Sequence, residues 1–199
     1  MNESKKYMIF FVIIAVCCVA ALLSACANTS KTPASTIQAP PDTTTTFILV
    51  RHAERANPNA DSPLSPQGEK RARALVDALG HMGVTAIYCP DIKRNRDTIL
   101  PLADLLDLEL NLIPNWRMLS TRKMAKEFVE EVLSQHAGGV VVWVGNKSPV
   151  GNWGSNLHEI YRKLGGTGTG PVHYDDLYII KLSDNGPVKI TKTKFGTEL

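Results

Sequence analysis

The chain has 199 residues, of which 44% are hydrophobic and 21% are charged, and its formal net charge is +3. This length fits one globular domain, and the hydrophobic fraction is too high for a disordered protein. The 22 basic residues are spread along the chain instead of forming a stripe, which argues against a nucleic-acid-binding protein.

The first 25 residues form a segment of their own. Lys5 and Lys6 precede an uncharged, apolar run over residues 7–23, and small residues follow it. A basic start, an apolar stretch and a small-residue end are typical of a signal peptide. Because the run is slightly longer than most such stretches, an uncleaved membrane anchor at the N-terminus is the alternative. Both interpretations predict that the rest of the chain is exported.

The end of this segment reads Leu23-Ser24-Ala25-Cys26, which resembles the lipobox of bacterial lipoprotein signal peptides. In such proteins the bond before the cysteine is cut and the new N-terminal cysteine carries lipid. The resemblance implies that residues 1–25 are removed, that Cys26 is lipidated and that the protein is anchored to a membrane. In a Gram-negative cell, alanine instead of aspartate at residue 27 would favour the outer membrane or the periplasmic face, and the sequence leaves the cell type open.

Residues 26–46 are rich in Ser, Thr, Pro and Ala. This composition cannot bury enough apolar surface to offset the entropy lost on ordering the chain. We therefore expect a tether over 26–46 and a folded domain over 47–199. Of the four cysteines, only Cys89 lies in that domain, so no intramolecular disulfide is expected in the mature form.

Short β-rich runs and longer amphipathic segments alternate from residue 47 onward. The predicted strands are 47–50, 84–88, 108–113, 140–144, 177–182 and 188–191. The predicted helices are 66–79, 92–106, 121–136 and 156–164, the first with Ser65 as its cap. Pro101 is expected to kink or shorten the second helix. The alternation predicts an α/β fold, a three-layer α/β/α sandwich around a mainly parallel sheet.

Basic residues gather where three of the predicted strands end. Arg51, His52 and Arg55 follow the first strand, Arg94 follows the second and Lys147 follows the fourth. In open sheets of this kind ligands bind outside the carboxyl ends of the strands, so these side chains are expected at one rim. Planar arginine side chains bind phosphate with paired hydrogen bonds. The rim therefore predicts a site for phosphate or another small oxyanion.

The order of motifs resembles the histidine phosphatase superfamily, which includes the phosphoglycerate mutases. The matching strings are ILVRHAERA at 48–56, LSPQGEKRARAL at 64–75, AIYCPDIKRNRDT at 86–98, VVVWVGN at 140–146 and YDDLYII at 174–180. The resemblance implies the same fold and a phosphohistidine mechanism, in which His52 attacks the phosphoryl group and water hydrolyses the intermediate. It implies no cofactor and no metal, and the five histidines show no metal-ligand spacing.

The resemblance also assigns roles to the other residues of the rim. Arg51 and Arg94 would bind the equatorial phosphoryl oxygens and neutralise charge in the transition state, and Arg55 would add to this clamp. Where the family has a second histidine, in a Gly-His pair after the fourth strand, this chain has Asn146. An amide donates a hydrogen bond but cannot become cationic, so a slower enzyme is expected. Lys147, the next residue, is a candidate for the missing charge, and a lysine that is simply solvated beside the strand end is the alternative.

The proton donor to the leaving group has one candidate within the motifs. In many relatives a carboxylate follows the third strand, but residues 114–126 contain none. Glu54, two residues after the nucleophile, is the candidate, and a structural pairing with Arg51 or Arg94 is an equal alternative.

Together these patterns predict an exported, lipid-anchored phosphatase that acts on a phosphomonoester, either a small molecule or a surface glycan, without metal or cofactor. A competing hypothesis is a pseudo-phosphatase that binds phosphorylated ligands at Arg51, His52 and Arg94 without turnover, because Asn146 replaces the second histidine. A third is a lipoprotein whose domain serves only as a scaffold for partners. The expected partners are a phosphorylated ligand and a membrane, and not nucleic acid.

Overall fold

The computed structural model describes residues 37–148 and 154–197, and the chain from residue 37 onward forms one compact unit. Its elements in chain order are β1 (Thr44–Arg51), α2 (Pro66–Leu79), β2 (Val84–Pro90), α3 (Lys93–Leu106), β3 (Leu110–Ile113), the 3-10 helix η1 (Asn115–Ser120), α4 (Thr121–Gln135), β4 (Val140–Gly145), α5 (Asn156–Lys163), β5 (Asp176–Ser183) and β6 (Lys189–Lys194).

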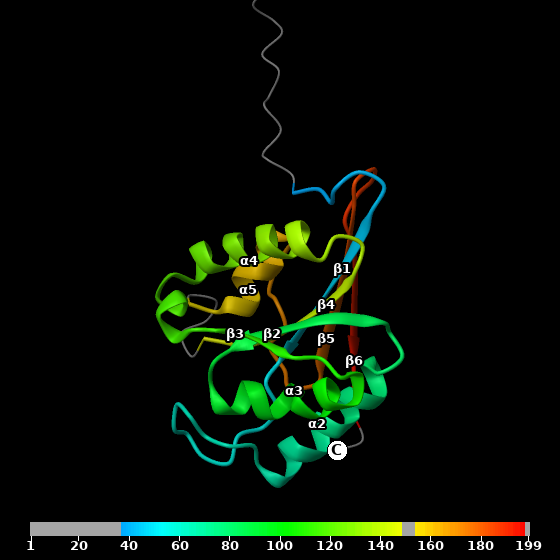
Figure 1. Cartoon of the computed structure of the whole chain (residues 1–199). Coiled ribbons are helices and arrows are strands. Elements are labelled where there is room, and N and C mark those ends of the chain that lie inside the picture. Colours follow the sequence, from blue (N-terminus) through cyan, green and yellow to red (C-terminus); the bar gives the residue numbers. More distant parts are fainter. Residues whose placement is uncertain (1–36, 149–153, 198–199) are drawn as a thin grey trace, which may run out of the picture. The chain divides into compact units, whose positions relative to one another are not determined.

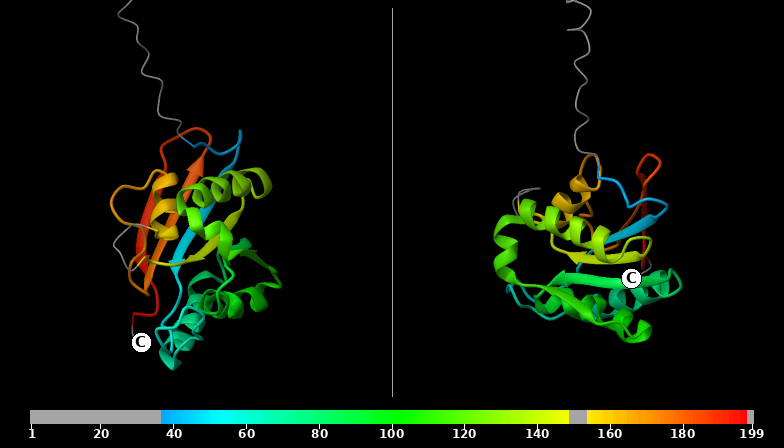
Figure 2. Two further views of the ribbon diagram at one scale, coloured as in Figure 1. Left: turned by 90° about the vertical axis from the view of Figure 1, so that its left-hand side faces the viewer. Right: turned by 45° about the horizontal axis from the view of Figure 1, so that its top comes forward.

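Six strands form one sheet in the order β3-β2-β4-β1-β5-β6. The pairs β3–β2, β2–β4 and β4–β1 are parallel, whereas β5 runs antiparallel to β1 and β6 antiparallel to β5. Helices α2 and α3 cover one face of the sheet, and α4 and α5 cover the other (Figures 1 and 2). The predicted α/β sandwich around a mainly parallel sheet is therefore confirmed.

The core has two halves, one on each face of the sheet, and β1 contributes to both. Phe47 and Leu49 pack with the α4 and α5 side, whereas Ile48 and Val50 pack with the α2 and α3 side. All four side chains are fully buried, and burial of each contributes about 1.5–3 kcal/mol relative to exposure. The alternation arises because successive strand residues point to opposite faces. Burial on both faces makes β1 a rigid support for whatever follows its last residue.

The predicted helix over 66–79 is observed as α2 with the same bounds. The hydroxyl of Ser65 accepts a hydrogen bond from the Gly68 backbone N–H at 3.1 Å, as expected of its cap. The expected shortening at Pro101 is wrong, because α3 continues through this residue to Leu106. Packing offsets the hydrogen bond lost at the proline, since the neighbouring Ile99 and Leu102 are fully buried.

The N-terminal end of the domain lies earlier in the chain than composition predicts. Strand β1 begins at Thr44, and Ile37 and Ala39 pack against the core on the α4 and α5 side. The boundary at residue 47 is therefore corrected to residue 37. The polar composition was misleading because β-branched threonines suit a strand, and Thr45 is buried with its hydroxyl accepting from the Gly138 N–H. The predicted signal peptide and residues 26–36 of the tether lie outside the described residues.

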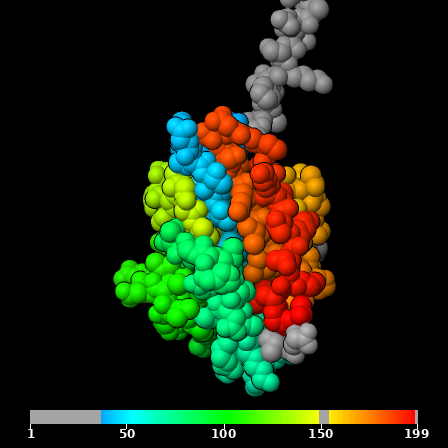
Figure 3. All heavy atoms as spheres, turned by 90° about the vertical axis from the view of Figure 1, so that its right-hand side faces the viewer, coloured from blue at the N-terminus to red at the C-terminus, as the bar shows by residue number. Residues whose placement is uncertain are grey.

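The C-terminal strands close the sheet at the β6 edge. Figure 3 looks onto this edge and shows the red C-terminal segment beside α2. Phe195 is buried in the core on the α2 and α3 side, and Arg71 of α2 donates hydrogen bonds to the carbonyl oxygens of Phe195 and Gly196. Within residues 37–148 and 154–197, no helix has the length and hydropathy needed to cross a membrane.

Candidate active site

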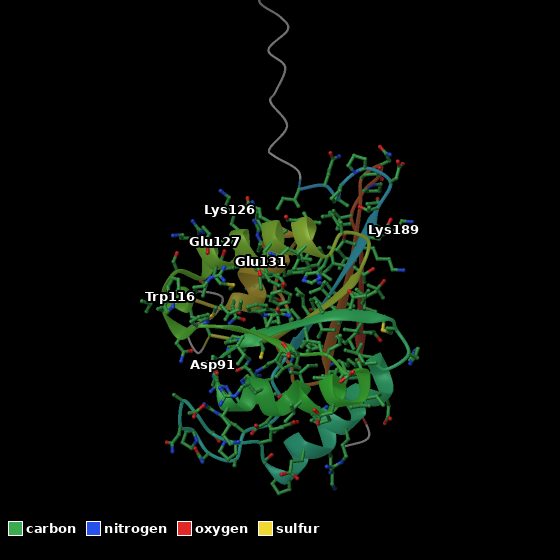
Figure 4. All side chains as sticks on the ribbon, viewed as in Figure 1. Asp91, Trp116, Lys126, Glu127, Glu131 and Lys189 are labelled. Carbon is green, nitrogen blue, oxygen red and sulfur yellow. The ribbon has the colours of Figure 1, made fainter. Side chains whose placement is uncertain are left out.

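The site lies where β1 and β4 end side by side. Arg51 is the last residue of β1 and is paired with Gly145, the last residue of β4. The His52 backbone N–H donates to the Gly145 carbonyl oxygen at 3.0 Å. Asp91 and Trp116 follow the ends of β2 and β3 on the same side of the domain (Figure 4). The expected rim at the carboxyl ends of the strands is thus present.

His52 is held as a neutral ring, and its second nitrogen has no partner among the described residues. The side chain is 4% exposed, and Nδ1 lies 2.8 Å from the Ala53 carbonyl oxygen. A carbonyl oxygen only accepts, so Nδ1 carries the proton and Nε2 keeps its lone pair. Burial lowers the pKa of His52 to about 3, and the charges of Arg94, Arg51 and Arg55 act in the same direction, although the Ala53 hydrogen bond opposes them. An uncharged imidazole with a free Nε2 is a nucleophile.

The guanidinium of Arg51 is fixed by the segment that precedes β5. Nη1 donates to the Val172 carbonyl oxygen at 2.8 Å and Nη2 donates to the Tyr174 hydroxyl at 3.2 Å. The guanidinium also stacks on the Tyr174 ring, 3.9 Å from its centroid. The Nε–H is buried and has no partner among the described residues. One donor of a well-fixed cation is thus left for a ligand.

Arg94, near the start of α3, is fixed in a similar way. Nη1 donates to the Ala60 carbonyl oxygen, and Nη2 donates to the Asn146 side-chain oxygen at 2.9 Å. Its buried Nε–H likewise has no partner in the part of the chain that the structure describes. Burial lowers the pKa of Arg94, and the charges of Arg55 and Arg51 lower it further. Three neighbouring cations that repel one another favour a bound anion.

Asn146 contacts Arg94 through its side-chain oxygen. Its backbone N–H donates to the Asn156 side-chain oxygen at 2.8 Å, and its carbonyl oxygen accepts from the Ser155 hydroxyl at 3.2 Å. The start of α5 therefore positions Asn146, and Asn146 in turn positions Arg94. A hydrogen bond from its amide to a phosphoryl group stays a prediction. The same holds for a ligand contact of Arg55 or Lys147, both of which are exposed.

The contacts of Glu54 favour a structural role. Arg71 Nε lies 2.9 Å from each carboxylate oxygen of Glu54, and Nη2 lies 2.6 Å from Oε1. Both side chains are largely buried, with exposures of 7% for Arg71 and 16% for Glu54. Paired hydrogen bonds of this kind between a guanidinium and a carboxylate are strong. Glu54 thus links the strand end to α2, and its structural partner is Arg71 instead of Arg51 or Arg94; proton donation by Glu54 stays a prediction.

The LSPQG string packs the start of α2 against the segment after His52. The Ser65 N–H donates to the Glu54 carbonyl oxygen at 2.9 Å, and a Cβ at Gly68 would lie 2.1 Å from the same oxygen. Only glycine allows this approach. Thr98 of α3 makes a second link, because it accepts from the Ala53 N–H at 2.8 Å and donates to the Arg94 carbonyl oxygen at 2.7 Å. The motif residues thus support the histidine and arginines without contacting a ligand.

Sequence reasoning missed Tyr174, whose ring also packs edge-on against His52 with 5.7 Å between centroids. The prediction considers only residues that follow the carboxyl ends of strands, and Tyr174 precedes a strand. Strand β5 is antiparallel to β1, with Leu177 paired to Val50, so its beginning lies at the rim. The signal that was available is the position of Tyr174 at the start of the last matching string.

Metal-ligating side chains do not cluster in the described residues, since no group of three His, Cys, Asp or Glu is placed to hold an ion. What the rim offers is a neutral imidazole nitrogen beside two buried guanidinium N–H donors. This set can accept a phosphoryl group covalently and hold its oxygens by charge-assisted hydrogen bonds.

Comparison with known proteins adds a likeness in sequence and in fold. A probable phosphoglycerate mutase, GpmB, of Enterobacter sp. (strain 638) is 30% identical over 97 residues, and the match covers 45% of either chain, less than half of that relative. The protein histidine phosphatase SixA, solved with tungstate, superposes with a TM-score of 0.54 at 13% identity, covering 75% of this chain and 96% of that one. A mycobacterial glucosyl-3-phosphoglycerate phosphatase gives 0.53 at 13% identity, with coverages of 75% and 97%.

A family model covers most of the folded unit. The model of the histidine phosphatase superfamily, branch 1, matches residues 47–166, from the middle of β1 to just beyond α5. That range contains His52, both arginines of the rim and Asn146. The chain therefore belongs to branch 1 of the histidine phosphatase superfamily.

Proposed function

We propose that the protein is a phosphatase that transfers the phosphoryl group of a phosphomonoester to Nε2 of His52 and then to water. In the first step the Nε2–P bond forms and the P–O bond to the leaving group breaks, with its electron pair going to the leaving oxygen. In the second step water forms a new P–O bond, the Nε2–P bond breaks, and phosphate and a proton are released. The observation that carries this proposal is the fixed neutral tautomer of His52, with Nε2 free.

The two arginines are suited to the charge that moves in this reaction. Arg51 and Arg94 each keep one buried Nε–H without a partner among the described residues, on cations whose other nitrogens are fixed by the protein. Such fixed donors need little reorganisation when the phosphoryl oxygens enter the site. The proposed substrates are phosphorylated small molecules or surface glycans. The similar proteins are named as a phosphoglycerate mutase, a glucosyl-3-phosphoglycerate phosphatase and a protein histidine phosphatase, and these names point to phosphorylated ligands as well.

A pseudo-phosphatase is the second candidate, and Asn146 is the observation that favours it. This residue stands where the family has its second histidine, and its side-chain oxygen faces Arg94. It gives the transition state no additional positive charge. Loss of one such group costs about 10²- to 10³-fold in rate. We therefore expect slow turnover from the wild-type protein and faster turnover from Asn146→His.

The test is an assay of the full-length chain in detergent with a panel of phosphomonoesters. We expect turnover that His52→Ala abolishes and that His81→Ala, a change at an exposed histidine, leaves intact. Binding of inorganic phosphate without turnover by the wild type would instead support the pseudo-phosphatase. A wild type that neither turns over nor binds phosphate would contradict both candidates.

We also propose that the protein is exported and held at a membrane by lipid on Cys26. The support is the sequence pattern: Lys5 and Lys6, the apolar run over 7–23 and the cysteine after small residues. This anchor would keep the phosphatase domain close to the membrane and expose it to phosphorylated compounds outside the cytoplasm.

A further inference from the structure

The carboxylates around the active site are already engaged, and this restricts how a leaving group can depart. Glu54 is the acidic residue nearest to His52 in sequence, and both of its oxygens accept from Arg71. Release of Glu54 from this contact would leave a largely buried guanidinium without its carboxylate, which is strongly unfavourable. Glu54 is therefore committed to a structural contact with α2.

Asp61 lies on the Arg94 side of the site. Its Oδ1 accepts from the backbone N–H of Lys93, the first residue of α3, at 2.7 Å. An ionised carboxylate at a helix N-terminus is stabilised by the N–H groups that have no partner within the helix. The charge of Asp61 also raises the pKa of Arg94, although burial has the larger, opposite effect. Asp61 is thus suited to hold the start of α3 and to act as a counter-charge for the arginine.

The acids on the β5 side are held in the same manner. Lys194 Nζ lies 2.8 Å from Asp175 Oδ1 and 3.3 Å from Asp176 Oδ1. The other oxygen of Asp176 accepts from the backbone N–H groups of Val172 and His173, both at 2.8 Å. The hydrogen bond from Lys194 lowers the pKa of Asp175. These contacts favour two carboxylates that build the segment carrying Tyr174.

The two remaining acids near the start of α3 are paired with bases. Asp91 contacts Arg96, and Asp97 contacts Lys93 at 3.1 Å. Residues 114–126, which follow β3, contain no Asp or Glu. Each of these carboxylates thus already has a structural contact, whereas a general acid must be able to give a proton to the leaving group.

We infer that the substrates of this site are phosphoryl compounds whose leaving group departs without receiving a proton from the protein. Such compounds are acyl phosphates, phosphoanhydrides and N-phosphoryl compounds. Among esters, aryl phosphates are expected to react faster than alkyl phosphates. This inference rests on the proposed function. It extends the substrates from phosphomonoesters to phosphoryl compounds with better leaving groups, and it places alkyl esters, such as phosphorylated glycans, last. In the step with His52, the P–O or P–N bond breaks and its electron pair goes to the leaving atom. That atom is either an oxygen that is stable as an anion, or a nitrogen that has already taken a proton from water and departs as a neutral amine. Alkoxides are poor leaving groups because they need a proton as the bond breaks.

The test is a leaving-group series with the full-length protein. Phenyl, 4-nitrophenyl and 2,4-dinitrophenyl phosphate present the same phosphoryl group with leaving groups of falling basicity. Their kcat/KM values report the transfer to His52 and are independent of the later hydrolysis. Because a general acid contributes about 10²- to 10⁴-fold, we expect kcat/KM to rise by at least about 100-fold across the series. Acetyl phosphate and phosphoramidate are expected to exceed glycerol 3-phosphate by a similar factor.

Three variants keep the inference open to refutation. Glu54→Gln, Asp61→Asn and Tyr174→Phe each remove one group that could donate a proton, and we expect the dependence on the leaving group to keep its slope in all three. A steeper slope in any of them would identify the missing acid and overturn the inference. A flat series in the wild type would also overturn it.

If the proposed function is wrong, the same assays will give a different result. In that case even 2,4-dinitrophenyl phosphate and acetyl phosphate would not be turned over, or their turnover would survive His52→Ala. Turnover that depends on His52 but not on the leaving group would leave the proposed function standing and contradict only the inferred substrate class.

Discussion

His52 links its chemistry to the stability of the fold. Its pKa is lowered to about 3, whereas an unfolded chain has an ordinary histidine with a pKa of about 6.5. The unfolded state therefore binds more protons below pH 6.5, and stability is lost as the pH falls from there toward 3. At pH 5 this loss is about 2 kcal/mol relative to neutral pH.

The measurement is urea unfolding of the wild type and His52→Asn at pH 7 and pH 5. We expect the wild type to lose about 2 kcal/mol more than the variant between the two conditions, because only the wild type gains this proton on unfolding. Equal losses in the two proteins would show that His52 is not held neutral in the folded state.

Tyr174 is expected to position Arg51 through two separable contacts. Tyr174→Phe keeps the stacked ring and removes the oxygen that accepts from Arg51, whereas Tyr174→Leu removes both contacts. Stacking of a cation on a ring contributes about 0.5–2 kcal/mol, so the second change is expected to raise KM by a further factor of about 2 to 30. The KM values are measured by steady-state kinetics. The control variant is Tyr178→Phe, because this tyrosine contacts Tyr161 and Lys192. Equal KM values for all three variants would contradict the role.

Substitutions at Asn146 test how the charge at this position affects phosphate binding and turnover. Asn146→Ala removes the oxygen that holds Arg94 Nη2, and Asn146→Asp replaces it with an anion of the same shape. Removal is expected to cost about tenfold in kcat/KM, typical of one hydrogen bond to a charged group. The aspartate is expected to cost at least tenfold more, because it repels a phosphoryl dianion and competes for Arg94. Inhibition constants for inorganic phosphate test whether the aspartate variant loses more affinity than the alanine variant. An equal loss of affinity in the two variants would refute the prediction.

At the scale of elements, the contact of α2 with the segment after β1 is the tightest constraint. Gly68→Ala places a methyl group about 2.1 Å from the Glu54 carbonyl oxygen, so α2 or the segment carrying Glu54 must move. Overpacking of this kind costs about 1–3 kcal/mol. Denaturant unfolding measures it, with Gln67→Ala on the exposed side of the same helix as the control. If both variants unfold at the same denaturant concentration, the close approach does not constrain the fold.

The sequence could predict these elements because their signals are local. The apolar run after residue 46 and the Ser-Pro start of α2 depend only on neighbouring residues, and the structure has both. The partner of Glu54 depends on which helix face meets the strand end, and Arg71 lies 17 residues away. Tyr174 depends on the direction of β5, which the alternation of strands and helices does not reveal. The sequence therefore does not predict the partner of Glu54 or the position of Tyr174, because both depend on long-range geometry. The family motif does point to His52, Arg51 and Arg94.

At the scale of the whole molecule, the proposed anchor gives a simple expectation. Cys26→Ser removes the sulfur that would carry lipid, so the variant is expected to lose the mass of the lipid and the cleavage at residue 26. Mass spectrometry of membrane-extracted protein is the measurement, with Cys89→Ser, a buried cysteine of the domain, as the matched control. A wild type that retains Met1 and carries no lipid would contradict the anchor without affecting the phosphatase proposal.

The central claim is that His52 carries the phosphoryl group during turnover, and trapping of the phosphorylated protein tests it most directly. The full-length protein is mixed rapidly with 2,4-dinitrophenyl phosphate, quenched in alkali and digested for mass spectrometry. We expect the peptide that contains His52 to gain one phosphoryl group, which acid removes and alkali does not. Turnover with an unmodified His52, or with the phosphoryl group on another residue, would contradict the account.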